Sequence, residues 1–268
     1  MMADRFIPIT CDPAEQATAD LISGACAEAL QLVQESWGLD APQDCRIYVM
    51  TSWLGFVFQS APWSWRILLA ATLPVWSFRA RRTWRYSAAW TQRYGQRVAI
   101  GIKPPRLVAQ SDKSFGARMF VEEKDMPTNI RRVVCHELTH ACSAQLRLPA
   151  WLNEGIATVT VDRFAGKRTI LTETLNLIRD YQPKAPPPTY RALSRMRGEA
   201  FVYHAVRGYW LAGYAEEKCP GFLKRKFSLN WQARTIEQEI AIELGMRPEN
   251  FWSEIDAAVS DHFIKITG

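Results

Sequence analysis

Residues 128–155 read TNIRRVVCHELTHACSAQLRLPAWLNEG, and this stretch decides how the 268-residue chain is interpreted. His136 and His140 lie four positions apart in it. On an α-helix, residues with this spacing share a face one turn apart, so both imidazoles can bind one metal ion. Glu137 lies beside them, where its carboxylate can reach a water on that ion. The alternative is a buried helix whose two histidines make ordinary hydrogen bonds.

A third metal ligand is expected from the element that follows. Catalytic zinc sites use three protein ligands and leave one position open. Glu154 lies 14 residues after His140, at the start of a second apolar segment. Its carboxylate is well placed if that segment forms a helix that folds back against the first. Gly155 has no side chain and would let the two helices approach closely.

HELTH followed by PAWLNEGIA resembles the gluzincin metallopeptidases, especially their compact peptidase MA-like members. The resemblance covers about residues 130–160 and implies a zincin-like fold. It also implies that His136, His140 and Glu154 bind Zn²⁺ and that Glu137 is the general base. A zinc-dependent peptidase that hydrolyses peptide or protein substrates with a metal-activated water is the function implied.

The oxyanion donor is less well defined by this resemblance. Gluzincins use a tyrosine or histidine of a later helix, and the candidates here are Tyr203, Tyr209 and His204, with Tyr203 narrowly preferred. Plain packing is the alternative for each tyrosine. Thermolysin-like relatives have an aspartate four residues after the ligand glutamate, whereas this chain has Thr158 there and Asp162 one turn further on.

In this group, substrates pair with an edge strand by strand addition. By resemblance, the candidate edge is the strand predicted over residues 117–121, although it also fits an ordinary sheet edge. Cys135 and Cys142 flank the histidine motif. At these helical positions they point away from the metal face, so we interpret them as small core residues.

The remaining patterns predict an α+β, zincin-like fold. A small mixed sheet with an N-terminal helix precedes a mainly helical C-terminal half. We expect a single domain over residues 1–268, with a sheet half over 1–146 and a helical half over 147–268. Strands are expected over 45–51, 97–102 and 117–121, and helices over 13–36, 128–146, 151–164, 172–180, 198–217, 235–244 and 249–265.

The net charge of +6 comes from one segment. No acidic residue lies between Asp44 and Asp112, where ten basic residues and six of the 11 tryptophans are found. Most of this window is a basic, Trp-rich insert over residues 53–96. Three interpretations stay open: the solvated edge of a packed insert, an anionic membrane surface contacted through residues 53–106, or an acidic substrate or nucleic acid. The confinement of the basic excess to this segment argues against nucleic acid as a partner.

Residues 53–78 are apolar but are interrupted by Arg66 and by prolines, which favours a surface-inserting or core-packed hairpin over a membrane span. The six cysteines form no CxxC pair, and no secretory signal is evident, so we expect free thiols and a cytoplasmic protein, peripheral to a membrane in one interpretation. Two other functions stay open. One is a membrane-associated, non-hydrolytic protein with a structural zinc, and the other is a zinc hydrolase of a non-peptide amide.

Overall fold

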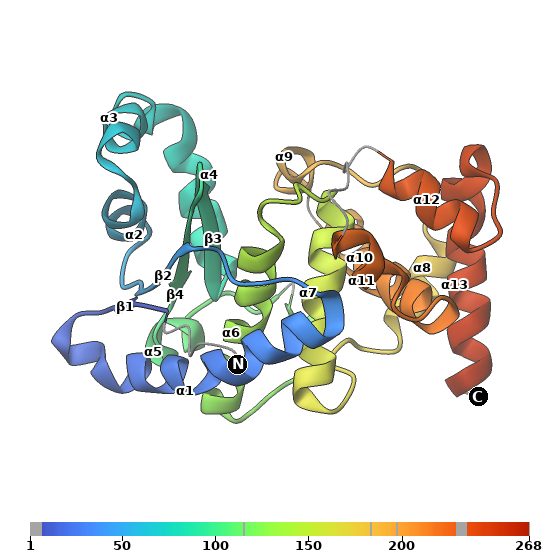
Figure 1. Cartoon of the computed structure of the whole chain (residues 1–268), viewed down its shortest axis with the longest axis horizontal. Coiled ribbons are helices and arrows are strands. Elements are labelled where there is room, and N and C mark those ends of the chain that lie inside the picture. Colours follow the sequence, from blue (N-terminus) through green and yellow to red (C-terminus); the bar gives the residue numbers. More distant parts are fainter. Residues whose placement is uncertain (1–6, 115, 183, 197, 229–234, 268) are drawn as a thin grey trace. The chain divides into compact units, whose positions relative to one another are not determined.

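A computed structural model describes residues 7–114, 116–182, 184–196, 198–228 and 235–267 (Figure 1). Contacts within the chain divide it into two compact units, and each is described by itself. Unit 1 contains the described residues up to Val33, then Asp40–Ser114 and Glu123–Gln145. Unit 2 contains Gln34–Leu39, the described residues of 116–122, and those from Leu146 onward.

Unit 1 is built on a four-stranded sheet with the order β1-β2-β4-β3. β1 pairs with β2 and β2 with β4 in parallel, whereas β3 and β4 are antiparallel. The small mixed sheet is therefore confirmed, and β3 lies at its edge. The strands are β1 (Ile9–Thr10), β2 (Asp44–Val49), β3 (Ala89–Tyr94) and β4 (Arg97–Ile102).

The structure corrects the prediction of the edge strand. Residues 117–121 do not form a strand: Gly116–Arg118 is a 3-10 helix, and only a single bridge joins Phe120 to Ile170. The edge strands are β1 and β3, and the sequence prediction missed both. The sequence feature that indicates β3 is the two-residue turn between it and β4, which begins with Gly95. In the structure Gly95 has φ 65°. Glycine tolerates this left-handed conformation and is favoured in tight hairpins.

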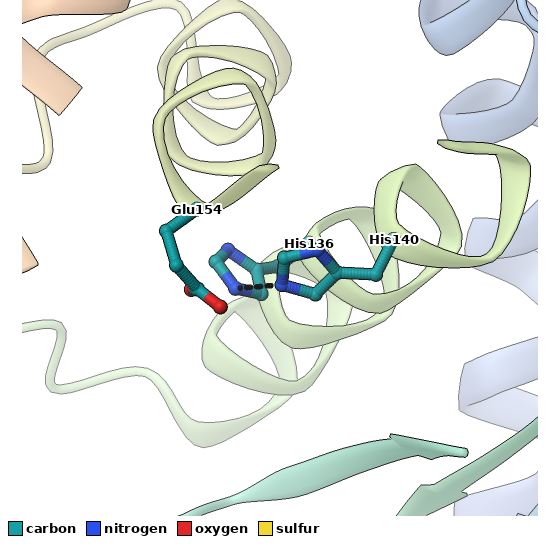
Figure 2. A group of neighbouring side chains, drawn as sticks. All are labelled: His136, His140 and Glu154. Atoms are coloured by element: carbon teal, nitrogen blue, oxygen red, sulfur yellow. Dashed lines mark hydrogen bonds between the residues drawn. The ribbon is translucent and has the colours of Figure 1, made fainter. Parts of the chain in front are cut away.

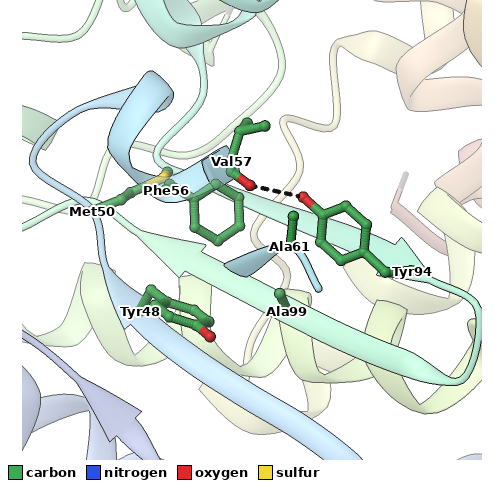
Figure 3. Packing of buried hydrophobic residues seen from close by; sticks show 7 residues of the cluster. All are labelled: Tyr48, Met50, Phe56, Val57, Ala61, Tyr94 and Ala99. Atoms are coloured by element: carbon green, nitrogen blue, oxygen red, sulfur yellow. Dashed lines mark hydrogen bonds between the residues drawn. The ribbon is translucent and has the colours of Figure 1, made fainter. Parts of the chain in front are cut away.

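Three helices join β2 to β3: α2 (Trp53–Ser60), α3 (Trp63–Ala71) and α4 (Leu73–Tyr86). The segment over residues 53–78, where a hairpin was expected, is therefore made of helices. Phe56 of α2 packs in a buried cluster with Tyr48 and Ala99 of the sheet (Figure 3). Gly101 makes room for this contact, because a Cβ there would lie 2.9 Å from the Phe56 ring.

The other face of the sheet is covered by α6 (Met126–Ser143). Along β3, Thr91 and Arg93 hydrogen-bond to α6, whereas Tyr94 bonds to Val57 of α2. Successive side chains of a strand point to opposite faces, so α6 and α2 lie on opposite sides of the sheet. α1 (Gln16–Trp37), preceded by a 3-10 turn, matches the helix predicted over 13–36, and α5 (Pro105–Ala109) is an additional short helix.

Unit 2 is helical in its described residues, and five predicted helices are found there to within two residues at each end. α9 and α11 were not predicted. The helices are α7 (Ala150–Ala165), α8 (Thr174–Asp180), α9 (Tyr190–Leu193), α10 (Gly198–Lys218), α11 (Phe222–Ser228), α12 (Ile236–Glu243) and α13 (Phe251–Thr267).

Two glycines set the crossing of α7 and α10. A Cβ on Gly155 would lie 2.3 Å from the carbonyl oxygen of Gly208, and a Cβ on Gly208 would lie 2.3 Å from that of Trp151. Side chains at either position would push the helices apart. Gly155 therefore permits the close approach of α7 to α10 within unit 2.

All six cysteines are free thiols. Cys135 and Cys142 are buried, as expected for core residues, and burial raises the pKa of Cys135 to about 12. Among the described residues, no helix combines the length and the apolar character needed to cross a bilayer.

Candidate metal centre

The histidine pair is held on α6. Asp125 caps this helix by accepting a hydrogen bond from the backbone N–H of Thr128 at 2.9 Å. Ile130, Val134 and Leu138 are fully buried at four-residue spacing and fix the helix in unit 1. The Nε2 atoms of His136 and His140 lie 3.0 Å apart, so the rings project together as the spacing predicts (Figure 2).

His136, His140 and Glu154 form a group that could hold a metal ion. Each offers one ligand atom, and these atoms all lie within 4.8 Å of one another (Figure 2). Two imidazoles and one carboxylate are a donor set that zinc accepts. In a tetrahedral zinc site, neighbouring ligand atoms lie about 3.4 Å apart, close to the separation of the two histidine nitrogens. The donors present therefore fit such an ion.

Glu137 is positioned by the edge strand. Its side chain is buried, and its Oε2 accepts a hydrogen bond of 2.5 Å from Thr91 Oγ1 of β3. Arg93, two residues along the same face of β3, donates to the carbonyl oxygen of Ala144 at the end of α6. β3 thus contacts α6 both at the carboxylate and at the helix end. Thr91 was not predicted as a site residue because β3 itself was missed.

Glu154 has its own partners in unit 2. Tyr190 of α9 donates from its hydroxyl to Glu154 Oε1 at 2.9 Å, and the same hydroxyl accepts from Asn153 Nδ2 at 2.7 Å. A hydrogen bond to a ligand carboxylate orients it and tunes a metal site. Tyr190 was not predicted as a site residue. It follows a proline-rich loop in an element of only four residues, so no local periodicity marked it.

Tyr203 is placed in the core of unit 2. Its side chain is 0% exposed, and its hydroxyl donates to Asp256 Oδ2 at 2.7 Å. Arg207 donates to the other oxygen of this carboxylate at 2.7 Å, and Lys184 lies 3.2 Å from Oδ2. Burial raises the pKa of Tyr203. These contacts hold the hydroxyl in a buried ion-pair network within unit 2.

Tyr209 is also committed elsewhere. Its hydroxyl donates to Asp162 Oδ2 at 2.6 Å, and burial raises its pKa. The other oxygen of Asp162 accepts from the backbone N–H and the hydroxyl of Thr169. Thr158, which stands four residues after Glu154 where thermolysin-like relatives have an aspartate, donates to the carbonyl oxygen of Glu154 at 2.9 Å. Asp162 therefore joins α7 to α10 and to the segment around residue 169, and Tyr209 takes part in this link.

His204 is the one oxyanion candidate that lies by Glu154. The two side chains line the same small cavity, together with Trp151 and Pro187. Burial lowers the pKa of His204 to about 4, which keeps the ring neutral. Its Nδ1 is buried and has no hydrogen-bond partner among the described residues.

Comparison with known proteins gives no match to a protein family, to a curated protein or to a solved structure.

Proposed function

We propose that this chain is a zinc-dependent peptidase of the gluzincin type with a zincin-like fold. The observation that carries the proposal is the group of His136, His140 and Glu154 together with a buried glutamate, Glu137, beside the first histidine. A purely structural zinc site has no use for such a carboxylate. Three protein ligands are also the number that a catalytic zinc site uses, because the fourth position stays open.

Zinc bound by these ligands would polarise the scissile carbonyl and lower the pKa of a water molecule. Glu137 takes the proton from the attacking water and later passes it to the leaving amine. Thr91 holds the carboxylate of Glu137 in one orientation through the 2.5 Å hydrogen bond. A fixed base loses less orientational freedom when the reaction begins.

We propose Tyr190 as the hydroxyl that donates to the oxyanion, in place of Tyr203 and Tyr209. Its hydroxyl donates to Glu154, whereas the hydroxyls of Tyr203 and Tyr209 donate to Asp256 and Asp162. The Tyr190 side chain is 44% exposed, so a substrate can reach it, and its hydroxyl would exchange the hydrogen bond to Glu154 for one to the oxyanion. Preorganised donors of this kind stabilise the charge that develops in the transition state.

The proposed substrate is a peptide or protein segment that pairs with β3. This strand is one of the two edges of the sheet, and its Thr91 hydrogen-bonds to Glu137, whereas the described residues of β1, at the other edge, do not. An extended peptide added to such an edge makes main-chain hydrogen bonds along its length. Its scissile bond would then pass close to the general base. This replaces the edge at residues 117–121, which is not a strand.

Two variants separate metal binding from hydrolysis. We expect the purified chain to bind about one zinc, as in mononuclear sites of this type. His136→Ala should lose the metal and the hydrolysis of a mixed casein or peptide-library substrate. Glu137→Gln should keep the metal and lose hydrolysis. Metal is measured by mass spectrometry of the protein after dialysis, and hydrolysis by the appearance of new amino termini.

The matched control is His262→Ala, since His262 pairs with Glu217 in unit 2. It should keep both the zinc and the activity. A wild-type chain that takes up no zinc would overturn the proposal. Zinc retained by a wild-type chain that cleaves no peptide would also overturn it, and would favour a structural zinc or a non-peptide amide substrate.

A further inference from the structure

The helices α3 and α4 present an exposed apolar surface that the proposed peptidase site does not use. Trp63 is 75% exposed, Val75 is 80% exposed and Phe78 is 72% exposed. Ile67 and Leu68 are also exposed, and no residue of α3 is buried. Soluble proteins rarely leave neighbouring large apolar side chains in water unless the surface has a partner.

The inner faces of these helices are already occupied. Trp76 and Trp84 of α4 pack against the buried cluster on the sheet, and Ala80 between them is buried. These residues lie four apart and form one helix face. Val75 and Phe78 lie on the opposite face of α4. The exposed side chains are therefore not part of the helix face that packs on the sheet.

Basic residues continue this outer face. Four of the ten basic residues between Asp44 and Asp112 lie on α4, directly after the apolar positions: Arg79, Arg81, Arg82 and Arg85. The side chains of Arg79, Arg81 and Arg85 are exposed.

We propose that the outer face of α3 and α4 docks on an anionic lipid bilayer. The apolar side chains of residues 63–78 enter the interface, and the arginines of residues 79–85 contact lipid phosphates. Figure 1 shows α3 and the start of α4 standing away from the sheet, at the end of unit 1 opposite α1. The helices have nine and 14 residues, so they lie on the membrane and do not cross it.

The charge and side-chain chemistry favour lipid over two other partners. A symmetric dimer through this face would bring the arginines of one copy towards those of the other, which is unfavourable. Nucleic acid would use arginine with aromatic stacking, but it offers nothing to Ile67, Leu68 and Val75. A bilayer interface accepts both the aliphatic and the cationic groups.

The test is co-sedimentation of the full chain with vesicles of phosphatidylcholine alone, and with vesicles that also contain about 30% phosphatidylserine. We expect binding to the anionic vesicles that weakens as salt is raised, because screening shortens the reach of the arginines. Replacing Arg79, Arg81 and Arg85 together by Gln should weaken this binding about 100-fold, at roughly fivefold for each cation.

A second variant set tests insertion. Trp63→Ser, Val75→Ser and Phe78→Ser together should abolish binding to the anionic vesicles and leave unfolding unchanged, since these side chains are exposed. One matched control is Lys113→Gln, Lys124→Gln and Arg247→Gln together, which removes the same charge at exposed sites elsewhere. The other is Ile242→Ser, at a position 66% exposed in unit 2. Both controls should bind like the wild type.

Three results would overturn the proposal. One is the absence of wild-type binding to anionic vesicles at low salt, and another is equal binding of the arginine variant and its control. The third is a dimer or a nucleic-acid complex that the Trp63, Val75 and Phe78 substitutions disrupt while vesicle binding survives. Glu137→Gln should bind vesicles like the wild type, so this test is independent of the proposed peptidase activity.

Discussion

Thr91 Oγ1 of β3 and Glu137 Oε2 of α6 lie 2.5 Å apart, and this hydrogen bond joins the edge strand to the carboxylate beside the histidine pair. The contact depends on the pairing of β3 with β4, in which Thr91 is opposite Ile100. A shift of this pairing by one residue would turn Thr91 to the other face of the sheet. Sheet register thus decides whether Glu137 is held.

Thr91→Val should lower kcat by about tenfold or more while zinc content and KM stay close to the wild type. Valine keeps the shape of threonine but cannot donate the hydrogen bond to Glu137. Thr91→Ser should restore most of the activity because it restores the donor. Steady-state kinetics with matched metal analysis checks this. Equal loss in the Val and Ser variants would show that Thr91 acts only through packing.

Tyr190→Phe should weaken zinc binding by about tenfold or more, because Glu154 loses the hydrogen bond that orients it. With saturating zinc, kcat should still fall by about 100-fold or more if the hydroxyl donates to the oxyanion. Zinc titration by competition with a chelator measures the first effect, and kinetics in excess zinc the second. Wild-type kcat in excess zinc would remove Tyr190 from the proposed mechanism.

Tyr203→Phe should reduce stability and leave activity intact. Its hydroxyl donates to the buried carboxylate of Asp256, and such bonds to charged groups contribute about 1.5–3 kcal/mol. Asp256→Ala should cost more, about 3–5 kcal/mol, because it leaves Arg207 buried without its carboxylate. Urea unfolding measures both losses. A Tyr203→Phe variant of normal stability but low activity would restore Tyr203 as an oxyanion donor.

Gly208→Ala should destabilise the chain by about 1–3 kcal/mol or more, because the new methyl group would lie 2.3 Å from the Trp151 carbonyl oxygen. The control is Gly213→Ala in the same helix. There the nearest atom to a new Cβ is in the Phe263 ring at 3.8 Å, an ordinary contact. This control should be neutral or stabilising, since alanine favours helix over glycine. Similar effects of the two changes in thermal unfolding would contradict the tight α7–α10 crossing.

Much of the secondary structure could be predicted because its signals are local. The histidine helix was predicted over 128–146, which lies within three residues of each end of α6. β4 was predicted with its observed ends, 97–102. The strand at 117–121 was wrong because ARMFV has strand-like residues, yet strand formation needs a partner along its length, and only Phe120 has one there.

The sequence by itself indicated His136 and His140 as candidate metal ligands, because a four-residue helical spacing places side chains on one face. Glu154 and Glu137 followed as candidates from the resemblance and from their positions near this pair. Tertiary structure alone decided the partners of these residues. Thr91 reaches Glu137 through strand pairing, and Tyr190 reaches Glu154 from 36 positions along the chain. It also buried Tyr203 against Asp256. Such contacts depend on how distant segments pack, and no local pattern in the chain encodes that packing.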